Sequence, residues 1–104
     1  MAVDNSSVID FISINKEDKV VLTISDHLKW NEEHLLLLQD KINSYIEIIE
    51  NKHIYEIYPD ANDKEIIIQV SLKYKPNNLG KTFLEQVTNY LESKNYKFSY
   101  YKIN

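Results

Sequence analysis

The sequence predicts an α+β fold in which a mixed four-stranded sheet carries two main helices on one face, with the elements in the order ββαβαβ. Two observations lead to this prediction. Apolar and polar residues alternate in several short segments, which is typical of half-buried strands. In two longer segments the apolar residues recur every three or four positions, which is typical of amphipathic helices. A length of 104 residues suits a single domain, 1–104.

The first two strands are predicted at 8–14 and 20–25, joined by the polar hairpin loop 15–18. Successive side chains of a strand point to opposite faces of the sheet, so a symmetric closure of this hairpin sorts its residues into two sets. The set expected to face the core is Ile9, Phe11, Val20, Leu22 and Ile24. The set expected to face outward is Asp10, Ile12, Ile14, Val21 and Thr23.

A long helix is predicted from Asn31 to about Asn51. Asn31 is a suitable N-cap, and Glu32 and Glu33 lie in the first turn, where the helix dipole favours negative charge. The residues expected to face the core follow helical spacing: Leu35, Leu38, Ile42, Tyr45, Ile46 and Ile49.

The second half of the chain continues with a short helical turn within 52–58, a strand at 66–74, a helix after Pro76, and a strand at 96–103. Asn77 or Asn78 provides the N-cap of this helix, and Asn95 is a suitable left-handed stop. The two flanking strands are expected to be parallel, because a helix connects them. The residues expected to point inward are Leu79, Phe83, Val87, Tyr90 and Leu91 of the helix and Tyr96, Phe98 and Tyr100 of the last strand.

The composition argues against several classes of function. The chain has twelve lysines, sixteen acidic residues and no arginine, for a net charge of −4. Arginine is the residue best suited to phosphate and guanine recognition, so nucleic acid is not expected as a partner. The absence of cysteine excludes disulfides and thiolate zinc sites. The start of the chain lacks the pattern of a signal peptide, and the longest apolar run has four residues, so we expect a cytoplasmic protein without a membrane partner.

The outward face of the predicted sheet is the main functional hint in the sequence. Two helices on one face leave the other face bare, and an apolar face of that kind indicates a protein-binding surface. We therefore expect a homodimer or a complex with another protein. The predicted interaction face consists of Ile12, Ile14, Val21, Ile67, Tyr101 and Ile103.

The alternative is a small-molecule- or metal-binding site, or an enzyme, built around His27, Trp30 and His34. Histidine is a metal ligand and tryptophan a suitable pocket wall. However, His27 and His34 are seven residues apart across a strand–helix junction, which is no standard ligand spacing. No catalytic motif and no phosphate-binding glycine loop occurs, so we expect no metal, no cofactor and no catalytic residue.

Several stretches of the chain resemble a family of small bacterial proteins that is known only as a domain of unknown function. They are the segments 8–12, 22–28, 33–39 and 58–61, of which Ser25-Asp26-His27-Leu28 and Glu33-His34-Leu35-Leu36-Leu37-Leu38-Gln39 are the most specific. The resemblance implies a bacterial cytoplasmic origin but no activity. The expected function is a non-catalytic interaction module, in one version an immunity- or antitoxin-type protein.

Overall fold

The computed structural model describes residues 9–103, which form four strands, three α-helices and a 3₁₀ turn. Strands β1 (Phe11–Ile14) and β2 (Val20–Asp26) come first. Helix α1 (Glu32–Glu50), the short helix α2 (Ile54–Ile57) and the 3₁₀ turn Pro59–Ala61 follow. Strand β3 (Ile66–Leu72), helix α3 (Asn78–Ser93) and strand β4 (Lys97–Lys102) complete the fold. This confirms the predicted order, with α2 as the predicted helical turn. Val8, the predicted start of the first strand, lies outside the described residues.

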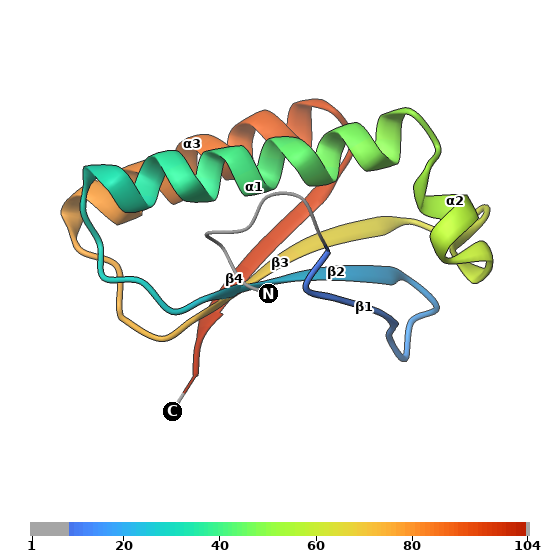
Figure 1. The fold of residues 1–104 in the computed structure, drawn as a ribbon, viewed down its shortest axis with the longest axis horizontal. Helices are drawn as coiled ribbons and strands as arrows, with labels where there is room; N and C mark the ends of the chain where they lie inside the picture. The colour runs from blue at the N-terminus through green and yellow to red at the C-terminus, as the bar shows by residue number, and fades with distance from the viewer. Residues whose placement is uncertain (1–8, 104) are drawn as a thin grey trace.

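The four strands form one mixed sheet in the order β1-β2-β3-β4. Strand β1 is antiparallel to β2, whereas β2, β3 and β4 are parallel, as predicted for the strands that α3 connects. Helices α1 and α3 lie side by side over one face of the sheet (Figure 1). Within residues 9–103 no helix covers the other face, which we call the open face.

Helix α1 begins and ends where the sequence predicts. Asn31 is its N-cap and accepts a hydrogen bond from the backbone N–H of His34 at 2.9 Å, and Asn51 is its C-cap. The buried side of the helix includes five of the six predicted residues, Leu38, Ile42, Tyr45, Ile46 and Ile49. It also buries His34 and Lys41, two residues that an apolar pattern cannot include.

The β1–β2 hairpin corrects the predicted assignment of faces. Ile12 pairs with Leu22 and Ile14 with Val20, so both isoleucines lie on the face that the helices cover. They pack against the core and do not belong to an outward interaction face. Phe11, predicted to point inward, lies on the open face and is 60% exposed.

The cause of this correction is the length of the hairpin loop. The backbone N–H of Asn15 donates to the carbonyl of Lys19 at 2.9 Å, so Asn15 extends the pairing and only residues 16–18 form the loop. Asp18 adopts a left-handed conformation with φ 63°, as expected for a three-residue loop. The side-chain oxygen of Asn15 accepts hydrogen bonds from the backbone N–H groups of Glu17 and Lys19, both at 3.0 Å. One residue fewer in the loop moves every β1 side chain to the other face.

Helix α3 has the predicted ends and part of the predicted buried side, since Leu91 is buried and Phe83 and Val87 pack against the core. Asn77 is its N-cap, and the left-handed Asn95 has φ 67°. Leu79 and Tyr90, predicted to face the core, are 44% and 51% exposed. The residues that α3 buries are Gly80, Leu84 and Leu91, so the helix is rotated about its axis relative to the predicted orientation.

The two parallel strands that flank α3 differ in burial. Strand β3 buries Ile66, Ile68, Val70 and Leu72 in strict alternation, as predicted. In β4, Phe98 packs against the core, whereas Tyr100 is 43% exposed although its position faces the helices. Strand β4 is thus an exposed edge strand.

The described residues include no helix that is both long enough and apolar enough to cross a membrane.

Two leucines on α1 provide a direct test of this packing. Leu38 is fully buried and Leu36 is 64% exposed. We expect Leu38→Ala to lower the free energy of unfolding by about 2–5 kcal/mol, because it leaves a cavity in the core. The matched control Leu36→Ala should change it by less than about 0.5 kcal/mol. Urea unfolding measures both values, and equal losses would contradict the described orientation of α1.

Candidate functional site

The open face retains three of the six residues of the predicted interaction face. Val21 and Ile67 are register neighbours on this face, and Tyr101 pairs with Ser71 at its β4 side. Val21 is buried, whereas Tyr101 is 46% exposed. Ile103 follows the end of β4 and is 45% exposed.

The remainder of the open face is more polar than the sequence predicted. Between Phe11 at one side and Tyr101 at the other lie hydroxyl and amide side chains that pair across the strands. They are Ser13, Thr23, Ser25, Gln69, Ser71 and Ser99. This face can therefore form hydrogen bonds through its centre and apolar contacts at its two sides, but it is not a continuous apolar patch.

Strand β4 is the more exposed of the two edge strands of the sheet. It is the last strand in the sheet order, so only one of its two sides is paired. All of its residues except Phe98 are exposed. Strand β1, at the opposite edge, has only four residues against six in β4. An edge strand presents a row of free N–H and C=O groups that can pair with another chain.

A buried polar pair lies where β2 meets α1. Nε2 of His34 is 2.6 Å from Oδ2 of Asp26, and the two residues are 1% and 2% exposed. The second carboxylate oxygen of Asp26 accepts a hydrogen bond from the backbone N–H of Leu28 at 3.1 Å. Nδ1 of His34 is buried and has no hydrogen-bonding partner among residues 9–103. This pair lies at the carboxyl end of a parallel strand, where ligands of open α/β sheets usually bind.

Trp30 covers this pair, and its position explains the single glycine. Its indole ring lies 4.3 Å from the His34 ring, and Nε1 donates a hydrogen bond to the carbonyl of Tyr74 at 3.0 Å. A Cβ atom on Gly80 would lie only 2.6 Å from the indole. Gly80 therefore provides space for the tryptophan rather than an unusual backbone conformation.

The structure brings together two of the three residues of the alternative site. Trp30 and His34 are in contact, and Asp26 joins them, whereas His27 is exposed. A hollow of about 410 Å³ beside His34 is lined by Leu28, Lys29, Asn31, Glu33, His34 and Leu37. No group of three or more acidic, histidine or cysteine side chains within residues 9–103 is arranged to hold a metal ion.

A second buried network connects β1 to α1 and was not visible in the sequence pattern. Nζ of Lys41 lies 2.8 Å from Oδ1 of Asp10, and Lys41 is fully buried. Oδ2 of Asp10 accepts a hydrogen bond from the backbone N–H of Ser25 at 2.8 Å. The hydroxyl of Tyr45 accepts from the N–H of Asp10 and donates to the carbonyl of Thr23. Burial raises the pKa of this hydroxyl well above its usual value, so it remains a donor.

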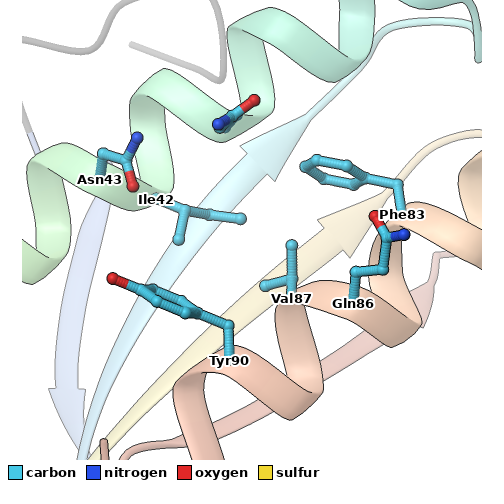
Figure 2. A pocket seen from close by; sticks show the side chains of 7 residues that line it. Ile42, Asn43, Phe83, Gln86, Val87 and Tyr90 are labelled. Carbon is cyan, nitrogen blue, oxygen red and sulfur yellow. The ribbon is translucent and has the colours of Figure 1, made fainter.

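A groove separates the two long helices on the outer side of the helix layer. It has a volume of about 380 Å³, and Figure 2 shows side chains of α1 and α3 pointing toward one another across it. Its lining contains no carboxylate, lysine or histidine, and Tyr90 is its one titratable side chain. The lining residues are Gln39, Ile42, Asn43, Phe83, Gln86, Val87 and Tyr90.

Fold and surfaces together define a small α+β domain with one exposed edge strand and one sheet face that no helix of residues 9–103 covers. The chain belongs to a family of unknown function, DUF6572, whose model matches residues 1–104. This confirms the resemblance to a domain of unknown function. Searches of curated proteins and of solved structures find no match.

The contact between Gly80 and Trp30 gives a testable double-mutant cycle. We expect Gly80→Ala to lower the free energy of unfolding by about 1–3 kcal/mol, because the added methyl group overpacks against the indole. In the Trp30→Ala background the same change should be neutral or stabilising, since alanine is the better helix former. Chemical denaturation of the four proteins measures the coupling. An identical effect in both backgrounds would show that the contact is unimportant.

Proposed function

We propose that this protein is a non-catalytic protein-interaction module that binds its partner along the edge of β4 and the adjoining open face. One observation carries the proposal: three large apolar side chains are exposed within four residues of the free edge. Tyr100 is 43% exposed, Tyr101 46% and Ile103 45%. Aromatic residues are enriched in protein interfaces, so their exposure on an unpaired strand favours binding of another chain.

The mode of binding follows from the position of these residues. A partner strand that pairs with β4 gains affinity from backbone hydrogen bonds and specificity from the alternating side chains. Tyr100 and Tyr101 lie on opposite faces of the sheet, so such a partner would contact an aromatic ring on either side. Phe11 and the hydroxyl side chains of the open face extend the contact surface away from the edge.

The proposal also covers the cellular location and the type of interaction module. It places the protein in the bacterial cytoplasm, in keeping with the resemblance, and includes an immunity- or antitoxin-type role, with which small size and net negative charge agree. The genomic neighbourhood distinguishes this role from others. A toxin gene beside the protein's own gene would support it, whereas a biosynthetic operon would favour the second candidate below.

Photo-crosslinking tests the proposed surface. A photoreactive amino acid replaces Tyr101 in one variant and Leu36, which is exposed on α1, in the matched control. In cells that contain the protein at its native level, we expect one discrete protein adduct from position 101 and none from position 36. The adduct should disappear when Tyr100→Lys is added. No adduct at 101, or equal adducts at both positions, would contradict the proposal.

A second candidate function is binding of a small molecule that donates a hydrogen bond at the Asp26–His34 pair. The observation that favours it is the buried, unpartnered Nδ1 of His34 next to a hollow, since orphan buried polar atoms are rare in proteins. With the Asp26 carboxylate accepting from Nε2–H, the neutral ring has its lone pair on Nδ1, where a hydroxyl or amide group can donate.

Nuclear magnetic resonance of the protein labelled with ¹⁵N tests this candidate. Titration with a set of small polyols and amides should shift the Nδ1 resonance of His34, while the resonances of His53, an exposed histidine, stay constant. Zinc alone should leave Nδ1 unchanged, because no group of three or more acidic, histidine or cysteine side chains within residues 9–103 is arranged to hold a metal ion. If no compound shifts Nδ1, the candidate is rejected.

A further inference from the structure

We infer that the occupant of the β4 edge is a second copy of this chain, whose β4 pairs in antiparallel orientation about Ser99 to form one continuous eight-stranded sheet. The inference rests on the proposed function, because it names the partner of the same surface. A two-fold interface requires a self-complementary patch. The sequence of β4, Lys97-Phe98-Ser99-Tyr100-Tyr101-Lys102, provides one.

Symmetry limits the possible registers. Directly opposed residues of an antiparallel pair point to the same face, and a two-fold axis perpendicular to the sheet preserves faces. One residue must therefore lie directly opposite its own copy, and the axis passes midway between the two. Placing Phe98 at the axis would shorten the stretch over which the two β4 strands pair. Ser99 and Tyr100 therefore remain as the residues that can lie at the axis.

The side chains favour the axis at Ser99. In that register Phe98 lies opposite the partner's Tyr100, which gives an aromatic pair on the helix face, and the two Ser99 hydroxyls meet at the axis. Lys97 then lies opposite the partner's Tyr101, and a lysine over a tyrosine ring is an attractive pair. Residues 9–103 already contain four such pairs at 5.6–5.8 Å. Centring on Tyr100 places Lys102 against the partner's Phe98 and Lys97 against the partner's Ile103, with no tyrosine for either lysine.

The helix layer is compatible with this dimer. Helix α3 packs on β4, and the groove residues of α3 face α1. The flank of α3 away from α1 contains Lys81, Glu85, Thr88 and Glu92, as the 100° rotation per residue requires. The pairing of β4 with its copy brings the two copies of α3 to neighbouring positions over the joined sheet. The two-fold axis makes these helices antiparallel, so Lys81 approaches the acidic half of the partner helix.

A single cysteine tests the register, since the chain has none of its own. Opposed residues of an antiparallel pair have Cα atoms about 4.5–5.5 Å apart, a separation that a disulfide can bridge. We expect Ser99→Cys to form a disulfide-linked dimer under mild oxidation. Ser93→Cys, at an exposed position on α3, and Tyr100→Cys, as the register control, should stay monomeric in denaturing gels. Efficient crosslinking of Tyr100→Cys but not Ser99→Cys would overturn the register.

Sedimentation of the wild type and of Tyr101→Lys tests the interface itself. Tyr101 is exposed, so the variant should keep the circular dichroism of the wild type. The new lysine at position 101 lies opposite the partner's Lys97, and the two-fold axis repeats this like-charge pair. We therefore expect the dimer dissociation constant to rise about tenfold or more. A wild type that sediments as one chain at high micromolar concentration overturns the inference.

The outcomes separate this inference from the proposed function. In one outcome, the wild type sediments as a monomer and still gives a discrete adduct from position 101 whose mass differs from that of two chains. This result leaves the proposed function intact and rejects the second copy. A wild-type dimer that persists in Tyr101→Lys and shows no Ser99→Cys crosslink rejects the second copy at β4, because the dimer then uses another surface. The photo-crosslink at position 101 still decides the proposed function.

Discussion

The buried ion pair between Lys41 and Asp10 is the constraint on which the arrangement of this small domain depends. A fully buried ammonium group is tolerated only with a partner and full hydrogen bonding, since removal of one member of such a pair typically costs about 3–5 kcal/mol. Asp10 provides the partner, and the hydroxyl of Tyr45 and the backbone of Ser25 complete its hydrogen bonds. The pair thus connects the segment before β1, the middle of α1 and the end of β2.

The Asp26–His34 pair has a similar role at the start of α1. His34 and Lys41 are seven residues apart, so they lie on the same side of α1, and each contacts a carboxylate from the sheet layer. Apolar packing alone tolerates small shifts of a helix along a sheet. Two polar contacts at separate points do not, because a shift of one turn would leave both carboxylates, the lysine and the histidine without partners in the core. The polar residues of this core therefore determine where α1 lies.

The features predicted from sequence are those that local chemistry determines. Asn31, Asn77 and Asn95 mark helix ends because capping and left-handed backbone conformations involve neighbouring residues only. Strand β3 was predictable because Ile66, Ile68, Val70 and Leu72 occupy every second position. The buried Lys41 was not predictable in the same way, since its partner Asp10 is 31 residues away in the sequence.

The same limit applies to the candidate sites. In α3, Gly80 contacts Trp30, 50 residues earlier in the sequence, while Leu79 and Tyr90 are exposed. The exposed edge of β4 follows from the strand order, which the pattern of elements did not specify. The presence of Trp30 and His34 in one cluster was visible in the sequence, whereas the contribution of Asp26 required the strand–helix geometry.

The hairpin loop at 16–18 has a consequence for how this family can vary. Asp10 faces Lys41 only because β1 has the register that a three-residue loop imposes. Loss of one loop residue would turn β1 over and carry the carboxylate to the open face, leaving an uncompensated positive charge inside the protein. The length of a solvent-exposed turn thus determines the charge balance of the interior. Sequence changes in this loop should be frequent, while insertions and deletions should be rare.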